Sequence, residues 1–183
     1  MLLNILYNFF LMINIFDFIH EKLYHKQVDE KLVFNKHTKA KVNYSIEKLS
    51  DKYNFDLIDS ECRTWYGGKK YNNKEFKISN DLFKTNITNK LLELNDEEIK
   101  SFADNLNDHF KDILNDKYSI ALGNFKGFAD NWCIIRLDID DDMCAEALYS
   151  NTKKTITFKI LKDETEIELE KILSNVIEYI IHN

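Results

Sequence analysis

The chain has 183 residues, of which 44% are hydrophobic and 13% aromatic, and its formal net charge is −6. A chain of this length and apolar content can bury the core of one domain, so we expect a single domain over residues 1–183. The three cysteines, Cys62, Cys133 and Cys144, form no C-x-x-C pair, which argues against a disulfide framework or a zinc knuckle and favours a reducing, cytoplasmic compartment.

The N-terminal segment, residues 1–28, is apolar and helical in pattern. Asn4, Asn8, Asn14 and Asp17 interrupt its apolar run, whereas a membrane-spanning helix needs roughly 20 mainly apolar residues. We predict a largely buried helix from about Leu2 to Tyr24, followed by an α+β body over residues 29–183. Membrane attachment through residues 1–19 is a second hypothesis for this segment, and residues 1–11 could be an extension.

A helix and a hairpin are predicted next. Ile46, Leu49 and Tyr53 continue a helical stripe that starts at Val42. Residues 55–66 are rich in strand formers and end at Gly67 and Gly68, which allow positive φ angles in a tight turn. We therefore expect residues 69–78 to return as the second strand.

Two further helices are predicted before the next strands. The first is short and lies within residues 80–94, with Leu82, Phe83, Ile87 and Leu91 on its apolar side. The second covers residues 95–117, because Asn95 and Glu98 have the spacing of a capping box and a continuous apolar face follows.

Residues 118–125 and 132–139 alternate as strands, and residues 153–161 do the same. Between them, Asp140 to Asp142 resemble the cap of a short helix that carries Met143, Cys144, Ala147 and Leu148. A long helix closes the chain from about Thr165, which has capping-box spacing to Glu168. The predicted fold class is α+β: a mainly antiparallel sheet of four to six strands, an N-terminal helix and two long amphipathic helices packed on it.

Charge is divided along the chain. Residues 1–90 carry 15 Lys/Arg and 11 Asp/Glu, whereas residues 91–183 carry 10 and 20. A field of one sign steers association with a partner of the opposite sign. We predict a non-enzymatic binding protein, of the inhibitor or immunity type, whose acidic C-terminal half engages a basic partner such as a nucleic-acid enzyme or a toxin, without a cofactor.

This prediction places the contact with the partner on acidic residues of the predicted 95–117 helix, of the 132–139 strand and of the short helix predicted after that strand. The candidate partner-binding residues are Asp104, Asp108, Asp112, Asp138, Asp140, Asp141, Asp142 and Glu146. The composition, with 23 lysines, two arginines and no proline, is typical of an A+T-rich genome and is compatible with a phage or mobile element.

Aromatic and basic side chains alternate on the predicted hairpin, a pattern that could stack bases and contact phosphates. The candidate residues are Arg63, Trp65, Tyr66, Lys69, Lys70 and Tyr71. The overall acidity and the scarcity of arginine argue against direct nucleic-acid binding.

Asp138 and Asp140 carry the alternative function, a metal-dependent hydrolase or nuclease. Carboxylates two residues apart on a strand share a face and could hold a divalent cation. No paired histidine or distant D-x-D motif accompanies them, and no phosphate-binding glycine motif occurs in the chain. The enzymatic alternative therefore rests on these two carboxylates.

Overall fold

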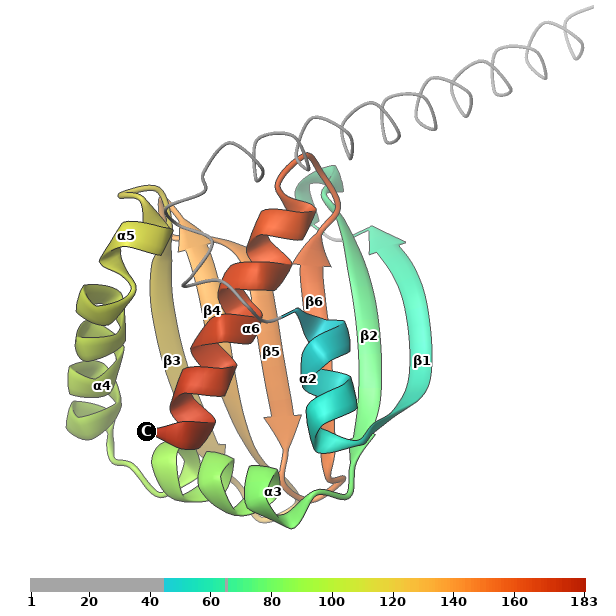
Figure 1. Ribbon diagram of the computed structural model, residues 1–183, viewed down its shortest axis with the longest axis vertical. Coiled ribbons are helices and arrows are strands. Elements are labelled where there is room, and N and C mark those ends of the chain that lie inside the picture. The colour runs from blue at the N-terminus through green and yellow to red at the C-terminus, as the bar shows by residue number, and fades with distance from the viewer. Residues whose placement is uncertain (1–44, 65) are drawn as a thin grey trace, which may run out of the picture. The chain divides into compact units, whose positions relative to one another are not determined.

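The computed structural model describes residues 45–64 and 66–183, all within one compact unit that comprises residues 41–183 (Figure 1). The helix predicted from Leu2 to Tyr24 and the possible membrane segment of residues 1–19 lie outside the described residues. Trp65 also lies outside them.

A single antiparallel sheet of six strands forms one layer of the described unit, as the α+β prediction required. Its order is β1-β2-β6-β5-β4-β3, so β1 and β3 are the two edges. The strands are β1 (Phe55–Thr64), β2 (Lys70–Ile78), β3 (Ser119–Lys126), β4 (Asn131–Ile139), β5 (Asp142–Ser150) and β6 (Thr155–Leu161).

The predicted hairpin is formed by β1 and β2. Gly67 and Gly68 lie in the short η1 turn (Tyr66–Gly68) and have φ angles of 79° and 73°. Residues with a Cβ atom rarely adopt such angles. The alternation expected for residues 153–161 is also confirmed, because Ile156, Phe158 and Ile160 are buried in β6.

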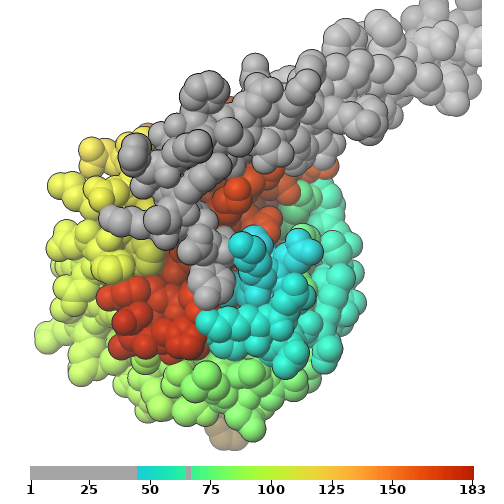
Figure 2. Space-filling view, viewed as in Figure 1, coloured from blue at the N-terminus to red at the C-terminus, as the bar shows by residue number. Residues whose placement is uncertain are grey.

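The helices form the second layer, on one face of the sheet (Figures 1 and 2). They are α2 (Ile46–Tyr53), α3 (Asp81–Ile87), the π-helical η2 (Thr88–Leu92), α4 (Asp96–His109), α5 (Lys111–Leu114) and α6 (Glu166–His182). α6 packs on β4, β5 and β6, α4 packs on β3, and α2 packs on β1 and α6. The two longest described helices, α4 and α6, therefore both pack on the sheet.

α6 supplies the centre of the core. Leu169, Leu173, Val176, Ile177 and Ile180 have no exposed surface. Each such side chain contributes about 1.5–3 kcal/mol on burial. This helix therefore determines which face of the sheet is covered.

Three local predictions were wrong. Residues 142–150 form β5 rather than a helix, because Asp140 and Asp141 take left-handed φ angles of 50° and 67° and make a two-residue hairpin turn. The 95–117 helix keeps its capping box but breaks at Phe110 into α4 and α5. Thr165 makes no capping hydrogen bond with its side chain; instead Asp163 accepts one from the Thr165 amide.

A buried polar cluster joins α2 to α6. Glu178 is only 8% exposed. Its carboxylate accepts a 2.8 Å hydrogen bond from the Tyr53 hydroxyl and forms an ion pair with Lys52. Nε2 of His182 lies 2.9 Å from the Tyr53 hydroxyl and 3.0 Å from Lys52 Nζ. A buried carboxylate is tolerated only with such partners, so this cluster holds α2 on α6.

Replacing Tyr53 by Phe should lower the free energy of unfolding by about 1–2 kcal/mol, because the buried Glu178 carboxylate loses a hydrogen bond. Urea denaturation followed by circular dichroism measures the change. Tyr179→Phe is the matched control, since its hydroxyl has no hydrogen bond to a described residue, and it should change stability by less than about 0.5 kcal/mol. Equal effects of the two variants would contradict the role given to Tyr53.

Candidate partner-binding surface

The acidic residues of α4 and α5 form a continuous exposed run. Residues 93–116 contain eight Asp and Glu side chains against two lysines, and all eight acids are exposed. Glu97, Asp104 and Asp108 are spaced i, i+7 and i+11, so they follow one face of α4. We call this set the α4–α5 acidic surface; it comprises Glu93, Asp96, Glu97, Glu98, Asp104, Asp108, Asp112 and Asp116.

α4 is held firmly against the sheet. The side-chain amide of Asn107 donates to the carbonyl of Ile120 at 2.8 Å and accepts from its amide at 2.8 Å, so it pairs with the outer backbone of edge strand β3. Ile99 and Leu106 are buried beneath the helix. At its C-terminal end the exposed His109 ring stacks on Tyr179 with 4.1 Å between ring centroids. The carboxylates therefore project from a fixed support.

Two predicted contact residues lie away from this surface, on the sheet face opposite the helices. Asp138 is 5% exposed, and its Oδ2 accepts a 2.7 Å hydrogen bond from Arg136. Glu146 is half-buried, with Oε1 lying 3.9 Å from Lys159 Nζ. Asp138 is paired with a residue of its own strand and Glu146 with one of the adjacent strand, and neither lies in the α4–α5 acidic surface.

The remaining predicted acids lie in the β4–β5 hairpin. Asp140, Asp141 and Asp142 are exposed, and Asp142 Oδ2 lies 3.7 Å from Lys69 Nζ. This hairpin and α5 lie at the same end of the sheet (Figure 1). The single acidic field expected from the sequence is therefore divided into α4–α5, the hairpin tip and the paired acids of the sheet.

The sequence analysis missed Glu93, Asp96, Glu97, Glu98 and Asp116 as members of the acidic surface. Of these, only Glu98 was used in the sequence analysis, as the capping-box partner of Asn95. A helical projection of residues 95–117 would have placed Glu97, Glu98 and Asp116 away from the apolar face, in solvent. Their contribution as a surface follows from that exposure.

The structure describes four of the side chains on the β1–β2 hairpin that were predicted to bind nucleic acid, and those of Trp65 and Tyr66 lie outside the description. Arg63, Lys69 and Lys70 are exposed, and Arg63 pairs with Glu61. Tyr71 is 5% exposed and donates a 3.0 Å hydrogen bond to the Met143 carbonyl, and burial raises the pKa of its hydroxyl. Its ring is therefore part of the sheet and cannot stack on a base.

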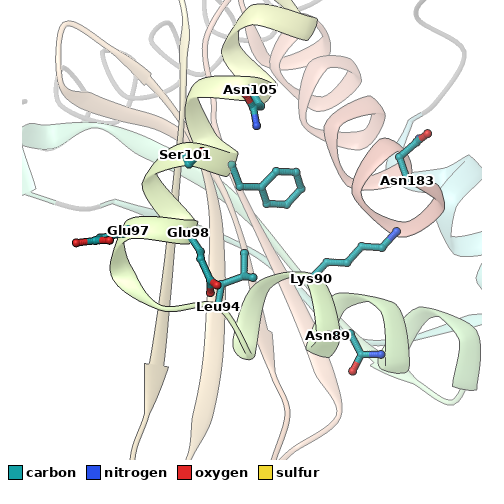
Figure 3. Close-up of a pocket in the computed structure, with 9 residues that line it drawn as sticks. Asn89, Lys90, Leu94, Glu97, Glu98, Ser101, Asn105 and Asn183 are labelled. Carbon is teal, nitrogen blue, oxygen red and sulfur yellow. The ribbon is translucent and has the colours of Figure 1, made fainter.

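A hollow of about 580 Å³ borders the acidic surface between η2, α4 and the end of α6 (Figure 3). The Lys90 side chain extends towards Asn183, and its Nζ lies 3.4 Å from the Ile181 carbonyl. Burial lowers the pKa of Lys90. Asn86 donates to the same carbonyl at 2.8 Å. Lys90 and Asn86 thus donate hydrogen bonds to a backbone carbonyl in the last turn of α6, and their role here is structural.

The described residues contain no group of three or more His, Cys, Asp or Glu side chains placed to hold a metal ion. Of the two carboxylates proposed for the enzymatic alternative, Asp138 is bound by Arg136 and Asp140 lies in the turn. None of the helices in the described part of the chain is long and apolar enough to cross a membrane.

No protein-family model matches the chain, and neither a curated protein nor a solved structure matches it.

The cysteines should differ sharply in reactivity. Burial raises the pKa of both Cys133 and Cys144 to about 12, whereas Cys62 is exposed on β1. Because the thiolate is the reactive species, a thiol reagent such as Ellman's should titrate Cys62 alone in the native protein and all three thiols after denaturation. A Cys62→Ser variant should show no fast phase. Rapid native reaction of a second thiol would contradict the burial of Cys133 and Cys144.

Proposed function

We propose that the protein is a non-enzymatic binding protein that engages a basic protein partner through the α4–α5 acidic surface. The observation that carries the proposal is the exposure of eight carboxylates against two lysines along residues 93–116. Glu97, Asp104 and Asp108 form no ion pair with a described residue, so their charge is not neutralised within that part of the chain. A field of this kind accelerates capture of a cationic surface.

The partner class follows from the same chemistry. Proteins that act on nucleic acid carry a basic track for phosphates, and an acidic helix can occupy that track. The docking of α4 through Asn107 limits the ordering cost on binding, because the carboxylates are already positioned. An inhibitor or immunity protein for a nucleic-acid enzyme or toxin is the concrete form of the proposal.

The test compares two variants with the same change in charge. The first, Asp104→Asn/Asp108→Asn/Asp112→Asn, removes three charges from the acidic surface. The control, Glu47→Gln/Asp51→Asn/Asp56→Asn, removes three exposed charges from α2 and β1. A partner captured from the source cells with the full chain as bait would be titrated against each by calorimetry.

The first variant should bind the partner about ten-fold or more weakly, and the control should bind within about two-fold of the unmodified chain. Binding should also weaken as salt rises, because exposed charges are screened over about 10 Å at 0.1 M ionic strength. Equal losses in both variants would show that only the net charge matters. A complex insensitive to salt and to the first variant would refute the proposal.

A further inference from the structure

None of the described helices covers the sheet face opposite α6 (Figure 1). This face carries both buried polar residues and half-buried apolar residues. Asn73, Asp138 and Ser150 are buried on it, and Ile134 and Leu148 are half-buried. Asn73 Oδ1, Arg136 Nε and Asp138 Oδ1 are three of the four buried side-chain atoms without a hydrogen-bond partner among the described residues. These polar atoms are covered within the chain itself and remain without a partner among the described residues.

The strand register aligns charged residues in one row across this face. Arg136 on β4 pairs with Glu146 on β5, Glu146 pairs with Lys159 on β6, and Lys159 pairs with Asn73 on β2. The charge along the row is thus positive, negative, positive and neutral. The midline of the six-stranded sheet falls between β5 and β6, with Glu146 and Lys159 on either side of it.

A row of this kind is complementary to itself. A two-fold rotation about an axis along the midline and parallel to the strands places β5 of one copy over β6 of the other. Glu146 then faces Lys159 of the second copy, and the contact occurs twice. With the pair inside each chain at 3.9 Å, the four groups form a ring of alternating charge. The same rotation places Ser150 opposite Thr155 and Leu148 opposite Thr157 of the second copy.

The area of the face matches what a stable dimer needs. Six strands spaced about 4.8 Å apart, each about eight residues long at about 3.3 Å per residue, cover about 750 Å². Specific interfaces bury about 800 Å² on each partner. Two twisted sheets can pack face to face in this way with their strands about 30° apart.

We propose that the protein forms a symmetric homodimer in which the sheet faces that no described helix covers pack together, with Glu146 and Lys159 paired across the two-fold axis. The α4–α5 acidic surface lies outside this interface, so the dimer presents two such surfaces. The dimer does not depend on the proposed function, and either can fail without the other.

Complementary charge reversals test the pairing directly in the full-length chain. Glu146→Lys gives a face with two positive groups at the midline, and Lys159→Glu gives one with two negative groups. Each variant alone should dimerise at least about 100-fold more weakly than the unmodified chain, because like charges meet across the axis. An equimolar mixture should recover a heterodimer, and the double variant Glu146→Lys/Lys159→Glu should recover a homodimer. Analytical ultracentrifugation measures each state.

Two controls separate loss of the interface from loss of the fold. Glu47→Lys makes the same change in charge on the exposed side of α2 and should leave dimerisation unchanged. Leu148→Glu places a charge beside the axis at a half-buried position, and it should give a folded monomer by circular dichroism. A monomeric unmodified chain, single variants that dimerise normally, or a mixture of folded single variants that stays monomeric would each overturn the proposal.

Discussion

The burial of α6 on one face of the antiparallel sheet is the constraint on which the rest of the described structure depends. Its apolar side chains, among them Leu173, Val176 and Ile177, are fully buried against the central strands. Because this helix occupies the middle of one face, α2 and α4 pack beside it, towards opposite edges of the sheet. The polar cluster around Glu178 then fastens α2 to α6, and Asn107 fastens α4 to β3. The other face of the sheet receives no helix from the described residues.

This one-sided packing separates the acids into two chemical environments. Those on α4 and α5 lie on the outer side of the helical layer, where nothing described neutralises Glu97, Asp104 or Asp108. Those on the sheet lie within reach of basic residues on adjacent strands, as Glu146 does with Lys159. Asp138 lies two positions from Arg136 on the same strand face, and its carboxylate pairs with that arginine within the chain. Position in the fold therefore decides which acids are left to bind a basic partner.

The two proposed contact surfaces differ in what they can recognise. A surface of one sign repels a copy of itself and needs a partner of the opposite sign, which is the case of α4 and α5. A row of alternating sign can pair with its own copy, which is the case of the sheet face. The half-buried Ile134 and Leu148 beside that row add the apolar contact that charge pairing alone does not supply.

Local patterns in the sequence were sufficient for much of the fold. The capping box at Asn95, the turn at Gly67 and Gly68 and the alternation of β6 each depend on residues close together in the chain, and all three are present in the structure. The helix predicted after Asp140 failed because two adjacent aspartates serve a helix cap and a left-handed hairpin turn equally well, and pairing with β4 and β6 decided between them. The acidity of residues 93–116 was likewise evident from the sequence. Only the tertiary structure decided that Glu146 pairs with Lys159 and that these two residues flank the midline of the sheet, because strand order and register join residues distant in the chain.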